Sequence, residues 1–428
     1  VLCMPSSVVL QSNSRTSPAH PGNPPTRSRS TMEIAWQDWA GLLIRWLHLA
    51  TGIAWIGTSF YFIWLDQSLR RGQQLAPGVD GESWSVHGGG FYHVQKYMVA
   101  PEQLPEELHW FKYEAYFTWL SGFALMAVMY YFGAETYLID TQRADVSVPV
   151  AIIASLAFLA GGWLVYDLLC RLPIGRHTAP LALSVFVLIV LIGWGLNQLF
   201  SDRAAFLHVG AVIGTIMSAN VFFIIIPNQK QVVADLKAGR QPAARLGQQA
   251  KQRSLHNNYL TLPVLLLMVG AHYPLLFAGQ ATWGWLVIAL ILLIGGVVRH
   301  FFNTWHTGAR GSSLLWQWPL AALLGIALVI FLSTRHTAPL TEPVSDERAL
   351  TLIQMHCVAC HTATPSHSGF KSPPAGLTLD TRETVILAAE RVMAQAVLSK
   401  AMPLGNATGM TDRERAELGG WLRQQLRP

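Results

Sequence analysis

The residues with the clearest chemistry are two cysteines and a histidine near the carboxyl end of the chain. They form the run Cys357-Val-Ala-Cys360-His361. C-x-x-C-H is the attachment signature of a c-type haem. Cysteines at this spacing can reach the two vinyl groups of one porphyrin, and the next histidine can ligate its iron. A structural zinc site would need a second Cys or His pair. After the motif the sequence contains no further cysteine and a single histidine, His367. The run therefore predicts covalent haem c.

The iron of such a haem needs a second axial ligand, and methionine is the usual one in cytochromes c. Met402 is the favoured candidate. Pro403 prevents the chain from continuing as a helix there, so the methionine is held on irregular backbone. The alternatives in this region are Met355, Met393 and Met410. We therefore expect the iron to lie between His361 and Met402.

A small helical domain over residues 339–428 is expected to position these groups. Its helices are predicted at 345–356, 381–399 and 411–425. Residues 341–428 contain nine Lys or Arg and nine Asp or Glu, which is the composition of a water-soluble domain. A domain of this size has little core of its own, so the haem would supply much of the interior.

The rest of the chain has the composition of a membrane protein. The 428 residues are 51% hydrophobic and only 13% charged, with a mean hydropathy of +0.32. A helix needs about 20 apolar residues to cross a bilayer. Segments of this kind lie at 38–65, 113–134, 148–169, 179–200, 204–227, 257–278, 283–305 and 314–334.

The charges between these segments predict the topology. Lys and Arg are concentrated in the links after the first, third, fifth and seventh segments, and the positive-inside rule places those links in the cytoplasm. Both chain ends then face the periplasm, where haem c is attached. The predicted fold is all-α: an eight-helix transmembrane bundle at 32–338, followed by a small periplasmic cytochrome c domain at 339–428. The net charge of +6 lies mostly in loops and in the first residues, so it does not indicate nucleic-acid binding.

The first 31 residues differ from everything that follows. They are rich in Ser, Pro and Arg and contain no apolar run long enough for a signal peptide. Such a segment cannot bury a core. We expect residues 1–31 to be a disordered extension, with the true start at Met32.

Histidines inside the predicted spans are functional candidates, because ionisable side chains are costly in a bilayer. His48, His208 and His272 all fall in the half of the bundle nearest the predicted haem c. One hypothesis is a second haem, of type b, ligated by His48 with His208 or His272. The alternative is that these histidines form hydrogen bonds between helices.

Three runs of sequence resemble the membrane-integral, cytochrome-c-linked urate oxidase family of bacterial purine degradation. They are RWLHLATGIAWIG at 45–57, GGGFYHVQKY at 88–97 and KYEAYFTWLSG at 112–122, and the C-terminal C-x-x-C-H with Met402 completes the pattern. The resemblance extends from about Met32 to the carboxyl end.

The resemblance implies an enzyme of the bacterial inner membrane. It would oxidise urate toward 5-hydroxyisourate and pass the electrons through haem c to a respiratory acceptor or a soluble cytochrome. Composition and spacing alone indicate only a membrane domain coupled to haem c. The chain could therefore instead be a non-catalytic, membrane-anchored electron carrier of a respiratory complex. The sequence does not indicate the oligomeric state.

Candidate catalytic residues follow from the chemistry of urate, which is flat and anionic. It needs aromatic faces, hydrogen-bond donors and a base to accept a proton. Glu114, His93 and Lys112 supply the base and donors beside several aromatic residues near the cytoplasmic end of the bundle. The alternative for this region is an interfacial belt of aromatic and basic residues.

Overall fold

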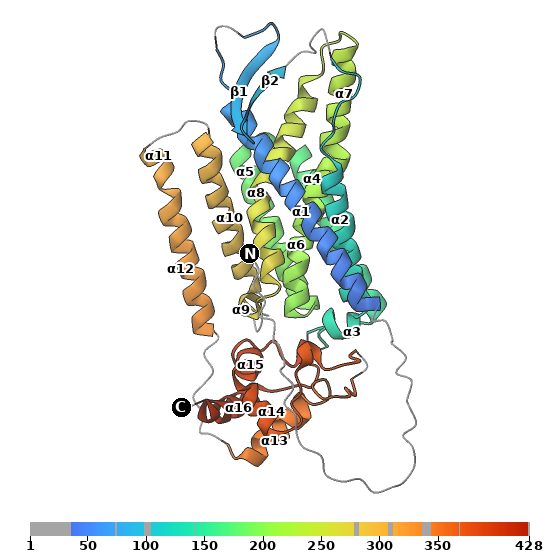
Figure 1. The fold of residues 1–428 in the computed structure, drawn as a ribbon, viewed down its shortest axis with the longest axis vertical. Coiled ribbons are helices and arrows are strands. Elements are labelled where there is room, and N and C mark those ends of the chain that lie inside the picture. The colour runs from blue at the N-terminus through green and yellow to red at the C-terminus, as the bar shows by residue number, and fades with distance from the viewer. Residues whose placement is uncertain are drawn as a thin grey trace.

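The computed structural model describes residues 36–72, 75–97, 104–141, 143–277, 282–306, 311–335, 344–367 and 369–426. Long helices form a bundle over residues 36–335, and shorter helices form a separate group over residues 344–426 (Figure 1). The expected extension 1–31, the start at Met32 and the boundary between residues 338 and 339 lie outside the described residues.

Each of the eight apolar segments coincides with a helix. In chain order these helices are α1 (Trp36–Ser68), α2 (Tyr113–Met126) with its π-helical continuation η1 (Ala127–Tyr131), α4 (Val148–Arg171), α5 (Thr178–Leu199), α6 (Asp202–Ala219) continuing through η3 (Asn220–Ile225) into α7 (Ile226–Lys237), α8 (Ala244–Gly270), α10 (Gly284–His306) and α12 (Gln317–Arg335). Short elements connect them: α3 (Ala134–Tyr137), η2 (Pro173–Arg176), α9 (Pro274–Phe277) and α11 (Ser312–Leu315).

Six of the helical segments are long and apolar enough to cross a membrane, judged by length and composition among the described residues. The two that fall short are α2, which changes to a π-helix after 14 residues, and α8, whose first half is polar. Large apolar side chains cover the outer faces of the apolar helices. Ile53 on α1 and Ile153 on α4 are each 65% exposed, and Leu183 on α5 is 63% exposed. Such surfaces are consistent with a membrane protein, because water disfavours extended apolar patches.

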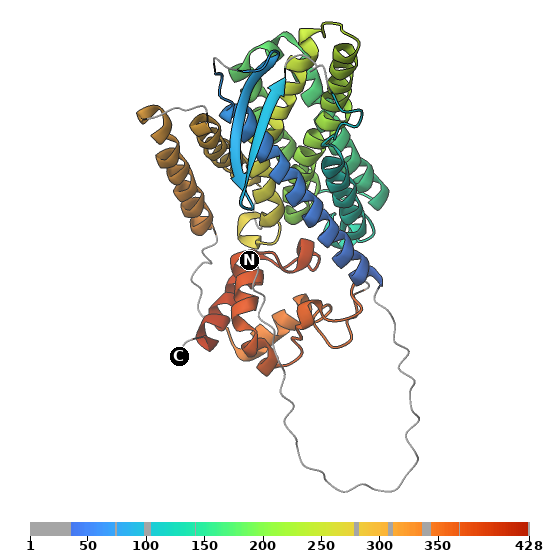
Figure 2. The same cartoon turned by 45° about the horizontal axis from the view of Figure 1, so that its top comes forward.

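The link between α1 and α2 contains a β-hairpin, which the all-α prediction did not include. Strands β1 (Val79–His87) and β2 (Gly90–Tyr97) pair antiparallel, with His87 opposite Gly90 (Figure 2). The two residues of the turn, Gly88 and Gly89, have positive φ angles of 59° and 79°. Two-residue hairpin turns of this kind favour glycine at both positions. The Gly-Gly-Gly run and its alternating flanks were therefore a strand signal.

The core of the bundle is built around α6. Val209, Val212, Ile213 and Ile216 are fully buried on this helix, which packs against α4, α5 and α8. Two glycines allow close helix packing at the next layer. A Cβ on Gly193 would lie 2.4 Å from Ile288 Cδ1, and a Cβ on Gly295 would lie 2.6 Å from Pro263 Cδ.

The C-terminal group of helices has its own core. It contains α13 (Asp346–His356), η4 (Pro374–Gly376), α14 (Arg382–Leu387), α15 (Ala389–Val392), η5 (Met393–Leu398), η6 (Leu404–Asn406) and α16 (Asp412–Gln425). Trp421, Leu418 and Leu422 on α16 are fully buried. The indole nitrogen of Trp421 donates to Asp346 Oδ1 at 2.7 Å, which ties the last helix to the first.

This C-terminal domain lies against the end of the bundle that carries α3 and α9 (Figures 1 and 2). The rings of Tyr137 and Phe370 are in edge contact at 6.5 Å. Ala401 packs against the core of the bundle, and a Cβ on Gly405 would lie 3.4 Å from the carbonyl oxygen of Ile139. The loop around residues 401–405 therefore faces the bundle.

Candidate functional site

The C-x-x-C-H run lies at the end of α13, where the helix gives way to turns. The backbone amide of His361 donates to the carbonyl oxygen of Cys357 at 2.9 Å, so the run closes one helical turn. Neither cysteine forms a disulfide within the described part of the chain. Burial is the main cause that raises the pKa of Cys357 to about 12, and burial also raises the pKa of Cys360.

The ring of His361 is oriented for ligation through one nitrogen. Its Nδ1 lies 3.0 Å from the carbonyl oxygen of Leu377, to which it can donate. This hydrogen bond fixes the tautomer that leaves Nε2 available as a ligand, which is the arrangement that metal-bound histidines adopt. The residues of the run therefore fit the haem c that the motif predicts. Among the described residues, no group of three or more His, Cys, Asp or Glu side chains could hold a metal ion. A zinc site here would therefore lack ligands.

The predicted second ligand, Met402, borders the same core. Met402, Cys357, Val358 and Leu377 all pack against the buried cluster of the C-terminal domain. Of the alternatives, Met393 and Met410 are buried within that cluster, at 8% and 2% exposure, whereas Met355 is 53% exposed. The structure thus leaves Met402 at the edge of the core, and its role as ligand stays a prediction.

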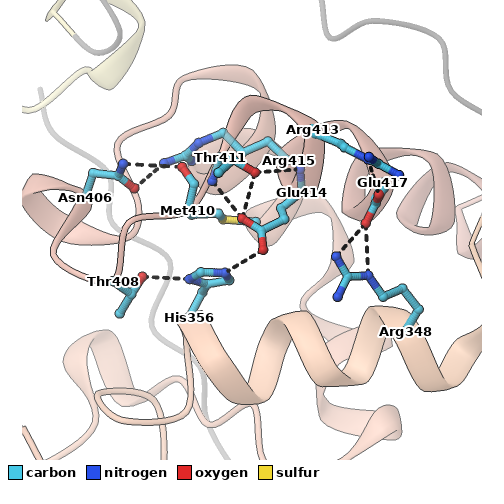
Figure 3. Close-up of polar contacts among 10 residues, drawn as sticks. All are labelled: Arg348, His356, Asn406, Thr408, Met410, Thr411, Arg413, Glu414, Arg415 and Glu417. Atoms are coloured by element: carbon cyan, nitrogen blue, oxygen red, sulfur yellow. Dashed lines mark hydrogen bonds and ion pairs between the residues drawn. The ribbon is translucent and has the colours of Figure 1, made fainter.

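A buried arginine holds the loop that carries Met402. Arg415 on α16 donates from Nη1 to the carbonyl oxygens of Ala396 and Met402, each at 2.5 Å. Its Nη2 donates to Asn406 Oδ1 at 2.9 Å (Figure 3). Arg415 is only 4% exposed, and burial lowers its pKa. One cation therefore fixes both ends of the loop.

The end of α13 is fixed by a neighbouring set of contacts. His356, next to the C-x-x-C-H run, shares a 2.8 Å hydrogen bond between Nδ1 and Thr408 Oγ1. Its Nε2 lies 3.6 Å from Glu414 Oε1 (Figure 3). Glu414 in turn accepts from Thr411 at the start of α16 in a capping box. The C-x-x-C-H run and the loop of Met402 are thus both held by contacts to the start of α16.

The three histidines proposed for a second haem occupy different environments. His208 is fully buried with both ring nitrogens in hydrogen-bond contact: Nδ1 lies 2.7 Å from the carbonyl oxygen of Ala204, and Nε2 lies 2.8 Å from Ser155 Oγ. His48 Nδ1 lies 2.9 Å from the carbonyl oxygen of Thr118 on α2. His272 is exposed in the turn after α8. The contacts of His208 and His48 are those of the alternative interpretation, hydrogen bonding between helices.

The three candidate catalytic residues are not brought together. His93 is on the hairpin, stacked on Trp84 at 4.1 Å and 2.7 Å from Glu82 Oε2. The amine of Lys112 lies over the Tyr113 ring at 4.7 Å, and Glu114 begins α2. Among the described residues, no hydrogen bond, ion pair or ring contact joins these three to one another.

The bundle contains a buried polar layer that the sequence interpretation missed. Arg253 on α8 is 4% exposed and pairs with Asp167 on α4 at 2.7 Å. Its guanidinium lies over the Tyr166 ring at 4.9 Å. The hydroxyl of Tyr166 contacts His256 Nδ1 at 2.8 Å and accepts from Asn220 Nδ2 at 3.0 Å. Asn220 begins the π-helix η3, a type of distortion that is frequent at functional sites.

A second buried arginine lies on α10. Arg299 is 5% exposed, donates from Nε to Asn258 Oδ1 at 2.9 Å and stacks over the Phe60 ring at 4.1 Å. Charge counting between apolar segments treats arginines near segment ends as loop residues, but the structure places Arg253 inside α8 and Arg299 inside α10, both buried. The signal that could have identified them is the polar stretch 252–258 in a helix that otherwise reads as a span.

These features define a mostly helical protein with six helices suited to a membrane and an ionic layer between them. The family model described as urate oxidase N-terminal matches residues 34–334, and the chain belongs to that family. The match ends before the C-terminal domain. No curated protein and no solved structure matches the chain.

Proposed function

We propose that the protein is a membrane-bound oxidoreductase that oxidises urate toward 5-hydroxyisourate and transfers the electrons to its own haem c. Urate and water give 5-hydroxyisourate, two protons and two electrons. The urate oxidase family supports the substrate. The observation that carries the rest is the hydrogen bond of His361 to Leu377, which leaves one ring nitrogen of the C-x-x-C-H histidine available for iron.

In this proposal Cys357 and Cys360 hold the haem through thioethers, and His361 and Met402 are its axial ligands. Haem c, when bound, accepts electrons one at a time. Arg415 maintains the position of the Met402 loop through its three hydrogen bonds. The electrons continue to a respiratory acceptor or a soluble cytochrome.

We also propose that all eight helices cross the bacterial inner membrane, with the C-terminal domain in the periplasm. Helix α2 packs along α1, and α8 packs against both α6 and α10, so the two less apolar helices are parts of the bundle. Arg253 in the polar half of α8 contacts Asp167 on α4 and Asn220 at the start of η3, and Asn258 on α8 accepts from Arg299 on α10. Internal pairing of this kind makes a polar helix compatible with a bilayer.

Two sets of ring contacts support electron transfer from the bundle to the C-terminal domain; the first ends at Tyr131 and the second begins at its sequence neighbour Tyr130. Trp119 stacks on Phe123 at 5.4 Å, and Phe123 contacts Tyr131 at 6.2 Å. Closer to the domain, Tyr130 contacts Tyr137 at 6.5 Å. Tyr137 contacts Phe370 at 6.5 Å, and Phe370 contacts His367 at 5.7 Å. The backbone amide of His367 donates to the carbonyl oxygen of Ala359, inside the C-x-x-C-H run.

The test is spectroscopic. Urate is added without oxygen to air-oxidised membranes that contain the full chain, and the c-type absorption band is followed. We expect urate to reduce the band, and His361→Ala to abolish that reduction. Reduction by a quinol and none by urate would instead support the non-catalytic electron carrier.

A further inference from the structure

A pocket lies between the ends of α1 and α10 that are farthest from the C-terminal domain (Figure 1). Its volume is about 390 Å³, within the range of small-molecule pockets. Four aromatic rings, one arginine and one histidine line it: Phe60, Tyr61, Trp64, Phe302, Arg299 and His306. The composition is therefore flat aromatic surface around one permanent positive charge.

That charge lacks an acidic partner. Arg299 is 5% exposed, and among the described residues no carboxylate forms an ion pair with it. Its Nε donates to the neutral Asn258, which leaves the two terminal nitrogens without a hydrogen-bond partner in the described part of the chain. By contrast, Arg253, the other buried arginine of the layer, is paired with Asp167. A buried cation without a counter-ion is costly, so an anion is the complementary ligand.

The surroundings of Arg299 hold its guanidinium in one orientation. The Phe60 ring lies 4.1 Å below it. Asn258 Oδ1, which accepts from Arg299, also accepts from Asn303 Nδ2 at 2.9 Å. This sharing leaves two buried amide atoms, Asn258 Nδ2 and Asn303 Oδ1, without hydrogen-bond partners. With Nε of Arg299 held by Asn258, the two terminal nitrogens of the planar guanidinium can donate to two acceptors on the edge of a planar anion.

We propose that this pocket binds the substrate as a planar oxopurine anion, with Arg299 on its carbonyl edge and Trp64 and Tyr61 against its face. The proposal rests on the proposed function, because it identifies the site of that reaction. It also moves the binding site from Glu114, His93 and Lys112, which do not converge, to a pocket where charge and aromatic rings do. A lipid headgroup is the competing anion at a membrane surface, and the experiment separates the two.

The experiment measures urate binding without turnover. Purified full-length protein in detergent is fully reduced with dithionite, so that it cannot accept electrons, and binding of radiolabelled urate is measured by equilibrium dialysis. Loss of a charge-assisted hydrogen-bonding fork predicts that Arg299→Gln weakens urate binding about 10- to 100-fold. The matched control is Arg245→Gln, which removes an exposed arginine at the start of α8 and is expected to leave the Kd unchanged.

A second variant guards against misfolding of the first. Trp64 is half-buried, so Trp64→Leu is expected to fold and to weaken urate binding about 2- to 10-fold through lost stacking. Wild-type affinity for urate in both variants would overturn the pocket. A second outcome would also overturn it. If vesicles of anionic phospholipid compete with urate in wild-type protein and Arg299→Gln leaves the urate Kd unchanged, Arg299 does not bind urate.

The two proposals fail in different ways. If urate binds through Arg299 but never reduces the c-type band of oxidised wild-type protein, the pocket stands and the proposed oxidase function is wrong. If urate reduces the band equally well in wild type, Arg299→Gln and Trp64→Leu, the function stands and the pocket is wrong.

Discussion

Arg415 makes the strongest prediction about the C-terminal domain. Arg415→Met replaces the buried cation by an uncharged side chain of similar length. Three acceptors then lose Arg415 as their donor: the carbonyl oxygens of Ala396 and Met402 and the amide oxygen of Asn406. An acceptor deprived of its partner costs about 1–3 kcal/mol when it is buried. Ala396 is 3% exposed, whereas Met402 and Asn406 are only half-buried. The sum is therefore about 3–5 kcal/mol.

The cost should appear locally, in the loop that follows η5. Hydrogen-exchange mass spectrometry of the intact protein resolves peptides from this loop. Four of its amides donate to backbone carbonyls in the folded state: Met402 to Gln395 at 2.9 Å, Asn406 to Pro403 at 2.9 Å, Ala407 to Leu404 at 3.2 Å, and Gly409 to Asn406 at 2.8 Å. A change of about 3–5 kcal/mol corresponds to exchange that is faster by a factor of about 100 or more, as long as exchange follows the opening equilibrium.

Arg413→Met is the matched control. Arg413 is on the same helix, but its side chain is 89% exposed, and it forms an ion pair with Glu417. Exposed pairs contribute about 0–1 kcal/mol, so exchange in the loop should be unchanged. If Arg415→Met alters the loop by less than about 1 kcal/mol, Arg415 does not hold the Met402 loop, and its place in the proposed function is wrong.

Three further predictions concern the bundle. Gly295→Ala places a methyl group 2.6 Å from the Pro263 ring and should destabilise the α8–α10 contact by about 1–3 kcal/mol. Gly296→Ala meets nothing within 4 Å and should not; equal thermal denaturation of the two variants would contradict this. Asp167→Asn leaves Arg253 without its ion pair and should cost about 3–5 kcal/mol, measured by denaturation in detergent, whereas Asp235→Asn in an exposed pair should cost little. Tyr137→Leu interrupts the ring contacts at Phe370 and should slow reduction of the c-type band by urate but not by dithionite; equal slowing with both reductants would point to a damaged haem site instead.

The helices could be predicted from the sequence because each depends on a local pattern. Apolar runs such as 179–200 coincide with α5 within one residue at each end. The helix predicted at 411–425 is α16, and a capping box between Thr411 and Glu414 begins it. The hairpin was not predicted, although the Gly88-Gly89-Gly90 run permits the positive φ angles of a two-residue turn.

The polar layer was missed for a different reason. Whether an arginine near the end of a helix lies in a loop or inside a bundle depends on how far that helix extends. Helix α8 begins at Ala244, 13 residues before the span predicted from apolar residues alone, and this extension places Arg253 against Asp167. The partner is 86 residues away in sequence, so no local pattern pairs the two charges. The same holds for Arg299 and Asn258, which are brought together only by the packing of α10 on α8.

The placement of the two candidate sites has a mechanistic consequence. The pocket is lined by residues near the carboxyl ends of α1 and α10, and the C-terminal domain, which contains the C-x-x-C-H run, lies beyond the opposite end of the bundle (Figure 1). Electrons released in the pocket must therefore cross the bundle, whereas protons can leave at the pocket itself. A second haem was the first candidate for this crossing, but both ring nitrogens of His208 already contact Ser155 and Ala204. The same ring lies 5.9 Å from Tyr130, which contacts Tyr137 at the domain boundary. Ligation of iron by His208 stays a prediction, and the electron path we propose runs from Tyr130 through Tyr137 to Phe370.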